Sequence, residues 1–375
     1  MTPTNTVYIA LGSNKGNKLQ YLQDAIDAIF EKIGTVDKIS KVYETPALGF
    51  EGDNFYNACI RVETELKPKK LLKTLKQIEF ELGRSTKKSD TYESREIDLD
   101  ILFYGDEILE DSALVIPHPN LHKRKFVLQP LFDIAKDMTH PILNQSIKEL
   151  LEHCEDGSEI EAIKIWLKNP KKNFDFGNYN FIAIEGNIGA GKTSLANKIA
   201  QDFNAKLILE RFADNPFLPK FYKEPERYAF TLEMSFLADR YQQISDDLSQ
   251  LDLFKDFMVS DYDVHKSLIF SKVTLAEDEF ILYRKLFYQV YKDIARPDLY
   301  VYLYQNTERL QANIKKRGRK YESDIQDDYL EKINSGYLNF LRNQTELNVK
   351  IIDISEKDFV KNREDYLWLL NEINT

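Results

Sequence analysis

The spacing of apolar residues divides the chain into two halves with different patterns. In the first half, short apolar runs alternate with two stretches that have apolar residues at helical spacing. The predicted strands are Val7–Leu11, Ala58–Glu63 and Ile97–Phe103, and the predicted helices are Leu19–Ile33 and Pro68–Leu82. This order of elements predicts an α+β sandwich.

The second half alternates fully apolar strands with longer helices. The predicted strands are Phe181–Glu185, Lys206–Glu210, Leu299–Leu303 and Val349–Asp353. The predicted helices are Thr193–Phe203, Arg227–Gln250, Asp278–Asp293 and Thr307–Arg317. Buried strands that alternate with helices indicate an α/β domain with a parallel sheet.

A polar segment separates the halves. The stretch Leu167–Asn180 contains Pro170, Gly177 and several asparagines, and its apolar residues show no period. We therefore expect an N-terminal domain over residues 1–160, a linker over 161–179 and a C-terminal domain over 180–375.

Composition narrows the class of protein. The 375 residues include 51 basic and 61 acidic ones, so the formal net charge is −10. An acidic surface argues against a nucleic-acid or membrane partner and favours small-molecule substrates. Two cysteines exclude a disulfide scaffold, and the absence of a leader pattern or a long apolar run predicts a cytoplasmic protein.

The second half carries a phosphate-binding motif. The segment GNIGAGKT fits GxxxxGK[ST] and lies between a predicted strand and a predicted helix. Its glycines allow backbone amides to surround the phosphates of ATP, Lys192 would bridge the outer phosphates, and Thr193 would ligate magnesium. The expected ATP-binding residues here are Gly186, Asn187, Gly189, Ala190, Gly191, Lys192, Thr193 and Ser194.

Other segments of this half resemble the deoxynucleoside kinase family, in its bacterial deoxyadenosine/deoxyguanosine branch. The resemblance runs from about residue 180 to the C-terminus through ILERFADNPFLPKFY, RYAFTLEMSFLADRYQQ, SDYDVHKSLIF and KKRGRKYE. It implies that Glu210 is the general base, and that Tyr222 and Glu322 hold the sugar 3′-hydroxyl. Arg317 and Arg319 match a basic lid over the phosphates. Without that context, Glu210 could equally be a surface charge and KKRGR a solvated helix end.

Two positions depart from the family pattern. Glu233 stands where the family commonly has a base-reading Gln, and Asp261 begins an Asp-Arg-Ser pattern whose arginine is replaced by Tyr262. Asp261 remains an expected deoxynucleoside-binding residue. An ionised carboxylate only accepts hydrogen bonds, which leans to guanine. The resemblance favours deoxyadenosine, which we expect as the substrate, with deoxyguanosine as the alternative.

In the first half, Asp98 and Asp100 are spaced so that both carboxylates project from one face of a predicted strand. Two hard oxygen ligands this close suit magnesium that bridges ATP phosphates. An exposed acidic strand face is the simpler alternative. Basic residues near the pair favour the metal–triphosphate interpretation; they include Arg84, Lys87, Lys88, Arg95, His118 and Arg124.

This half resembles 6-hydroxymethyl-7,8-dihydropterin pyrophosphokinase over residues 7–147, through YIALGSNKGN, VYETPALGF, NFYNACIRVET, REIDLDILFYGDEI and IPHPNLHKRKFVLQPLFDIA. The resemblance implies a ferredoxin-like sandwich in which Asp98 and Asp100 hold two magnesium ions. The expected triphosphate contacts are Arg84, Arg95, His118 and Arg124, with Arg84 and Arg95 acting in catalysis. The expected pterin contacts are Thr45, Leu48, Phe55, Asn57 and Phe126. The segment 85–94 departs from better-known members of the family.

Together these features predict a bifunctional ATP- and magnesium-dependent transferase. One domain would transfer pyrophosphate to a pterin alcohol for folate synthesis, and the other would phosphorylate a purine deoxynucleoside for salvage. A nucleoside monophosphate kinase is an alternative for the C-terminal domain, and a non-catalytic ligand sensor or dimerisation module is an alternative for one of the two domains. Family resemblance also predicts a homodimer through the C-terminal domain.

Overall fold

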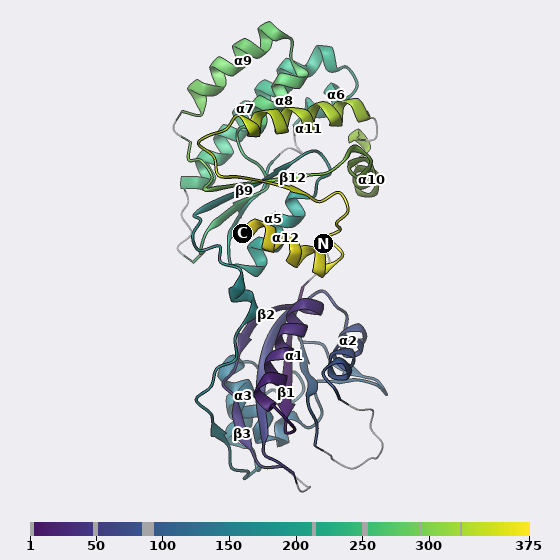
Figure 1. The fold of residues 1–375 in the computed structure, drawn as a ribbon, viewed down its shortest axis with the longest axis vertical. Coiled ribbons are helices and arrows are strands. Elements are labelled where there is room, and N and C mark those ends of the chain that lie inside the picture. The colour runs from purple at the N-terminus through teal and green to yellow at the C-terminus, as the bar shows by residue number, and fades with distance from the viewer. Residues whose placement is uncertain are drawn as a thin grey trace. The chain divides into compact units, whose positions relative to one another are not determined.

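The computed structural model describes residues 4–47, 52–84, 94–211, 215–249, 254–292, 294–322 and 325–375. The chain forms two compact units, Met1–Phe174 and Asp175–Thr375 (Figure 1). The division falls inside the segment 161–179. Part of that segment packs on the N-terminal unit, because β8 (Glu161–Ala162) pairs with β3 (Tyr43–Thr45) and the Asn169 side chain donates to the Val36 carbonyl.

The main sheet of the N-terminal unit is antiparallel, with the order β5-β1-β4-β3-β8, and β2 also pairs with β4. Its remaining strands are β1 (Asn5–Ser13), β2 (Gly34–Ile39), β4 (Phe55–Thr64) and β5 (Asp98–Tyr104). A separate hairpin consists of β6 (Leu109–Glu110) and β7 (Val115–Ile116). The helices are α1 (Lys18–Lys32), α2 (Pro68–Glu81), α3 (Lys125–Ala135) and α4 (Ile147–Glu152).

Alternation along β1 separates two cores. Tyr8 packs in a cluster with Val127 and Leu131 of α3 and with residues of α4, whereas Val7 and Ile9 project to the other face, where α1 lies. Helices therefore cover both faces of the sheet. The predicted α+β architecture is confirmed.

The C-terminal unit has a parallel sheet in the order β10-β11-β9-β12-β13. The strands are β9 (Phe181–Gly186), β10 (Lys206–Ile208), β11 (Met258–Ser260), β12 (Leu299–Tyr304) and β13 (Val349–Asp353). The helices are α5 (Lys192–Asp202), α6 (Leu218–Phe221), α7 (Pro225–Ser249), α8 (Lys266–Thr274), α9 (Glu277–Val290), α10 (Thr307–Arg317), α11 (Asp327–Arg342) and α12 (Arg363–Asn374). The predicted parallel α/β fold is confirmed.

Helices cover both faces of this sheet as well. Ile269 of α8 and Ile333 of α11 pack against Phe181 and Tyr300 on one face, whereas α5 and α12 lie on the other (Figure 1). Within the described ranges, no helix is long and apolar enough to cross a membrane.

Most predicted elements match the structure to within a few residues, with one difference that affects the site. β10 ends at Ile208, so Glu210 lies in the loop beyond the strand rather than at its last position. The backbone N–H of Glu210 donates to the Asp261 carboxylate at 2.8 Å, which explains why the ladder stops before this residue.

Candidate active sites

One cavity in the N-terminal unit collects most of the predicted site residues. They are Thr45 at the end of β3, Phe55 and Asn57 at the start of β4, Asp98 and Asp100 at the start of β5, and Arg124 and Phe126 at the start of α3, together with Arg95. Antiparallel pairing aligns these strand ends, since Gly12 of β1 is opposite both Asn57 and Asp98. The predicted Leu48 lies outside the described residues, as does the segment 85–93.

A polar group and two aromatic rings define one end of this cavity. Asn57 is buried and donates from its side-chain nitrogen to the Thr45 hydroxyl at 2.9 Å. Phe55 and Phe126 line the same space. A Cβ on Gly12 would lie 3.3 Å from the Asn57 side-chain oxygen, so the glycine keeps this end open. Aromatic faces and an amide edge suit a flat heterocycle with polar edges.

The carboxylate pair occupies the other end. Each oxygen of Asp98 accepts a hydrogen bond at 2.6 Å, one from Arg84 and one from Arg95. Although burial opposes ionisation, these two arginines lower the pKa of Asp98. Burial and the neighbouring charge of Asp98 raise the pKa of Asp100, and His118 partly offsets this rise.

This donor set fits a hard divalent cation, because two carboxylates project from one face of β5 into the cavity. In the part of the chain that the structure describes, no group of three or more His, Cys, Asp or Glu side chains could hold a metal. A magnesium ion here would therefore take its remaining ligands from the triphosphate and from water.

The sequence analysis missed Glu79, which supports this end of the cavity. It is 2% exposed, accepts from the Leu99 backbone N–H at 2.8 Å and from Lys76 at 3.0 Å, and also pairs with Arg84. Glu79 thus holds Arg84 beside the first residues of β5. Its position beside the buried Ile78 on the apolar face of α2 was the available signal.

The predicted phosphate loop joins β9 to α5 in the C-terminal unit. Gly189 and Gly191 have φ values of 85° and 88°, a region that favours glycine. The Lys192 ammonium donates to the Gly186 and Asn187 carbonyls at 2.9 and 3.0 Å, so the loop curls around it. Burial and the nearby Lys266 lower the pKa of Lys192 to about 8.

Thr193 and Asp261 form the candidate magnesium pair of this unit. The Thr193 hydroxyl donates to one Asp261 oxygen, and the other oxygen accepts from the Glu210 backbone. A hydroxyl and a carboxylate beside a phosphate loop fit magnesium. Asp261 therefore lies on the phosphate side of the cavity.

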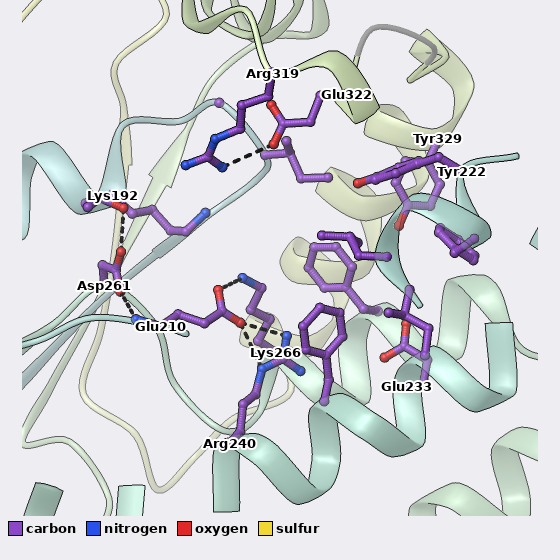
Figure 2. A pocket seen from close by; sticks show the side chains of 18 of the residues that line it. Lys192, Glu210, Tyr222, Glu233, Arg240, Asp261, Lys266, Arg319, Glu322 and Tyr329 are labelled. Carbon is purple, nitrogen blue, oxygen red and sulfur yellow. Dashed lines mark hydrogen bonds and ion pairs between the residues drawn. The ribbon is translucent and has the colours of Figure 1, made fainter. Parts of the chain in front are cut away.

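Glu210 is the buried centre of an ion-pair cluster (Figure 2). One oxygen accepts from Arg240 Nε at 2.9 Å, and the other accepts from Lys266 Nζ at 2.6 Å. Burial opposes ionisation, but Lys266 and Arg240 outweigh it and lower the pKa of Glu210 to about 2. Glu210 is consequently ionised at any neutral pH.

Arg240 and Lys266 are residues that the sequence analysis did not single out. Tyr262, which replaces the expected arginine, is fully buried, and its hydroxyl has no hydrogen-bond partner in the described structure. The cations on Glu210 come instead from α7 and from the first turn of α8. Arg240 follows Leu237 by three residues and precedes Ile244 by four, so the helical period places it on an apolar face, which was the available signal.

The predicted lid and sugar contacts lie together. Arg317, at the end of α10, donates to Glu322 from Nε at 3.0 Å, and Arg319 donates to the other Glu322 oxygen at 3.3 Å. Gly318 separates the two arginines with a φ of 70°. Tyr222 lines the same cavity, and its ring stacks near that of Tyr321.

Glu233 of α7 lines a part of the cavity that has aromatic walls. Phe221, Phe236 and Phe270 line the same cavity. Glu233 is 2% exposed, and its Oε1 accepts from the Thr274 hydroxyl at 3.1 Å. Its Oε2 has no hydrogen-bond partner among the described residues. Burial raises the pKa of Glu233 to about 7, against the lowering effect of Arg240.

Comparisons with known proteins match each unit separately. Residues 182–375 match the model of the family described as deoxynucleoside kinase, and residues 8–136 match that of 7,8-dihydro-6-hydroxymethylpterin-pyrophosphokinase.

Individual relatives give the same division. A deoxyguanosine kinase of Bacillus subtilis is 37% identical over 190 residues, which are 50% of this chain and 92% of the relative. A 2-amino-4-hydroxy-6-hydroxymethyldihydropteridine pyrophosphokinase of Aquifex aeolicus is 43% identical over 145 residues, 38% of this chain and 89% of the relative. A solved deoxyadenosine kinase from M. mycoides is 26% identical with a TM-score of 0.44, covering 52% of this chain and 99% of its own. The chain is therefore a fusion that belongs to two families, hydroxymethyldihydropterin pyrophosphokinase in its N-terminal unit and deoxynucleoside kinase in its C-terminal unit.

Proposed function

We propose that the N-terminal unit transfers the β,γ-pyrophosphoryl group of ATP to the hydroxymethyl oxygen of a dihydropterin and releases AMP. The observation that carries this assignment is a single cavity with two aromatic rings and an amide at one end and two carboxylates at the other. Phe55 and Phe126 stack on the pterin, and Asn57 reads its edge.

The charged end orients the triphosphate. Asp98 and Asp100 would hold two magnesium ions, which would supply charge neutralisation on the phosphates. Arg84 and Arg95 pair with Asp98 in the structure and would contact the triphosphate when ATP is bound. Arg124 completes the cationic surround, and the imidazole of His118, whose pKa is lowered by burial, contacts the triphosphate as a neutral group.

We propose that the C-terminal unit transfers the γ-phosphoryl group of ATP to the 5′-hydroxyl of a purine deoxynucleoside. The phosphate loop with Lys192 supports binding of the phosphates, and Thr193 with Asp261 supports binding of magnesium. Tyr222 and Glu322 hold the sugar, and Arg317 and Arg319 leave Glu322 to cover the transferring group. The carrying observation is that these groups line one cavity with Glu210.

Glu210 orients the attacking hydroxyl. A carboxylate with a pKa of about 2 is a weak base, so it accepts the hydroxyl hydrogen bond early and the proton late in the transfer. A loose transition state tolerates this order, because the oxygen loses its proton only as the new bond forms. Arg240 and Lys266 form ion pairs with Glu210 and hold it in place. We call this pair of cations the clamp on Glu210, and it takes the place of the arginine that the family has at the position of Tyr262.

For the base, we propose that deoxyguanosine is preferred over deoxyadenosine at neutral and higher pH. Two observations support this choice: the 37% identity to a deoxyguanosine kinase, and the unpartnered Oε2 of Glu233 at the cavity wall. An ionised carboxylate accepts from both the N1–H and the 2-amino group of guanine, whereas adenine offers one donor on that edge.

One experiment tests both halves. The full-length protein is incubated with ATP and magnesium, and phosphorus NMR follows the products with the pterin alcohol or with each deoxynucleoside. AMP with the pterin and ADP with a purine deoxynucleoside support both assignments. If ADP forms only when a nucleoside monophosphate is added, the C-terminal unit is a monophosphate kinase. If no acceptor leads to ATP consumption by that unit, it is a sensor.

We also propose a homodimer through the C-terminal unit. Ile281, Leu282 and Tyr288 of α9 leave 40%, 50% and 62% of their surface exposed, an apolar surface that a second copy could cover. Sedimentation should give twice the monomer mass. Leu282→Glu should reduce that mass, and an unchanged monomer mass for the parent protein would contradict the proposal.

A further inference from the structure

The Glu233 carboxyl group is held in one place but is only partly satisfied. Oε1 has a fixed donor in Thr274, and Oε2 is buried without a partner in the part of the chain that the structure describes. The Tyr283 hydroxyl reaches the Glu233 backbone carbonyl at 3.4 Å rather than the carboxyl group. Glu233 lines the cavity, and a buried polar oxygen that lacks a partner is costly unless a ligand completes it.

The charged groups around Glu233 do not compensate its charge directly. The titratable and charged neighbours are Arg240 on α7, Lys266 on α8, Tyr283 on α9, Tyr222 after α6, Tyr329 on α11 and Glu210 in the loop after β10. Arg240 and Lys266 are both engaged by Glu210. Figure 2 shows Glu233 apart from that cluster, beyond two aromatic rings.

Neighbouring groups hold their charge states through neutral pH. Burial raises the pKa of Tyr222, Tyr283 and Tyr329, so these phenols stay neutral. Glu210 stays ionised because Lys266 and Arg240 outweigh its burial. Glu233 has a pKa of about 7, so, unlike the four neighbours just named, its carboxyl group gains or loses its proton in the neutral pH range.

The two forms of a carboxyl group match different purine edges. An ionised carboxylate accepts two hydrogen bonds, which guanine supplies from N1–H and its 2-amino group. A protonated carboxyl group donates one hydrogen bond and accepts one, which adenine completes with N1 and its 6-amino group. Oε1 retains a second lone pair after it accepts from Thr274, so either pattern uses both oxygens.

We propose that the protonation state of Glu233 selects the purine: the ionised form takes the guanine deoxynucleoside, and the protonated form takes the adenine deoxynucleoside. This inference rests on the proposed deoxynucleoside kinase function and refines its substrate. Each substrate is thereby linked to one proton, with deoxyguanosine releasing it and deoxyadenosine taking it up.

The selectivity ratio provides the test. We measure kcat/KM of the full-length protein for deoxyguanosine and for deoxyadenosine from about pH 6 to about pH 8. This range spans the pKa of Glu233, which is about 7. The ratio should rise about tenfold per pH unit, because it follows the ratio of ionised to protonated Glu233. Effects of pH on Lys192, Glu210 or ATP apply to both substrates and cancel in the ratio.

Variants separate this effect from a general loss of activity. Glu233→Gln has one donor and one acceptor at every pH, so its ratio should be independent of pH. The matched control Glu226→Gln, at an exposed position of the same helix, should keep the parent slope.

Binding calorimetry in buffers of different ionisation enthalpy gives a readout that does not depend on turnover. Near pH 7, deoxyguanosine should release protons and deoxyadenosine should take them up. A flat selectivity ratio with both purines turned over, or proton transfer of the same sign for both, would overturn the inference and leave the kinase assignment intact. Turnover of neither purine at any pH would overturn the kinase assignment itself.

Discussion

The two units are proposed to bind the triphosphate of ATP in different ways, one mainly with backbone groups and the other with side chains. In the proposed C-terminal site, the backbone of the segment Gly186–Thr193 curls around the Lys192 ammonium. The proposed N-terminal site consists of side chains from separate elements: Asp98 from β5, Arg84 after α2 and Arg124 before α3.

This difference determines what each site requires of the fold. A backbone site needs a few glycines and one strand–helix junction, so it is local in sequence. A side-chain site needs correct sheet register and helix placement, because its residues lie far apart along the chain. Substitutions that distort the loop should therefore impair the C-terminal site, and substitutions that remove single charges should impair the N-terminal site.

The largest expected effect comes from removing the carboxylate that anchors the N-terminal cation site. Asp98→Asn should lower pyrophosphoryl transfer to the pterin by about 100- to 1,000-fold, because metal and arginine contacts are lost together. Deoxynucleoside phosphorylation by the same protein should not change. The exposed Asp106→Asn is the matched control, and full pterin turnover in Asp98→Asn would refute the site.

The reciprocal variant is Lys192→Met. Loss of the ammonium that the loop surrounds should reduce deoxynucleoside phosphorylation by about 100- to 1,000-fold, while pterin turnover stays intact. Both activities are measured on one preparation by product analysis. Equal loss of both activities would mean that the two sites are not independent.

A smaller effect is expected at the clamp on Glu210. Lys266→Gln removes a cation that lowers the pKa of Glu210, so that pKa should rise and the acid limb of kcat/KM should move to higher pH. We expect kcat to fall by about 10- to 100-fold. Lys266→Arg should restore the pH profile, and the exposed Lys272→Gln should not alter it. An unchanged acid limb in Lys266→Gln would contradict the clamp.

The backbone nature of the loop can be tested at Gly191. An alanine would have to adopt a φ of 88°, and its Cβ would lie 2.9 Å from Phe359 Cζ. The left-handed conformation alone costs about 1–2 kcal/mol. The unfolding temperature of the C-terminal unit should fall and the KM for ATP should rise. Gly157→Ala, at a position with open space for a Cβ, should change neither value. Unchanged values for Gly191→Ala would argue against a backbone-built site.

The smallest effect distinguishes the two ATP sites by pH. In the free protein Lys192 loses its proton as pH rises through about 8, so ATP binding must restore it. The KM for ATP of the kinase should therefore rise above that pH, approaching about tenfold per unit. Although burial opposes its charge, Asp98 and Glu79 raise the pKa of Arg84, so the pterin reaction should show no such rise. Parallel pH profiles would contradict this difference.

Several features were predictable because they are local. The helix Thr307–Arg317 and the strand Val349–Asp353 match the structure residue for residue, since apolar periodicity and caps such as Asn306 act over one or two turns. Short or atypical elements escaped prediction. The three-residue strand β11 is too short for a period, and α3 contains Pro130, which usually ends a helix.

The sequence alone determined the phosphate loop, the two-carboxylate strand and the division into two folds, because each depends on neighbouring residues. Tertiary structure decided how Glu210 is charged and how Asp98 is paired. Arg240 and Lys266 are 30 and 56 residues from Glu210, and only the packing of α7 and α8 brings them to it. Burial raises the pKa of both Glu210 and Glu233, but the contacts with Lys266 and Arg240 outweigh it at Glu210 and lower that pKa, whereas Glu233 has no cation in contact among the described residues.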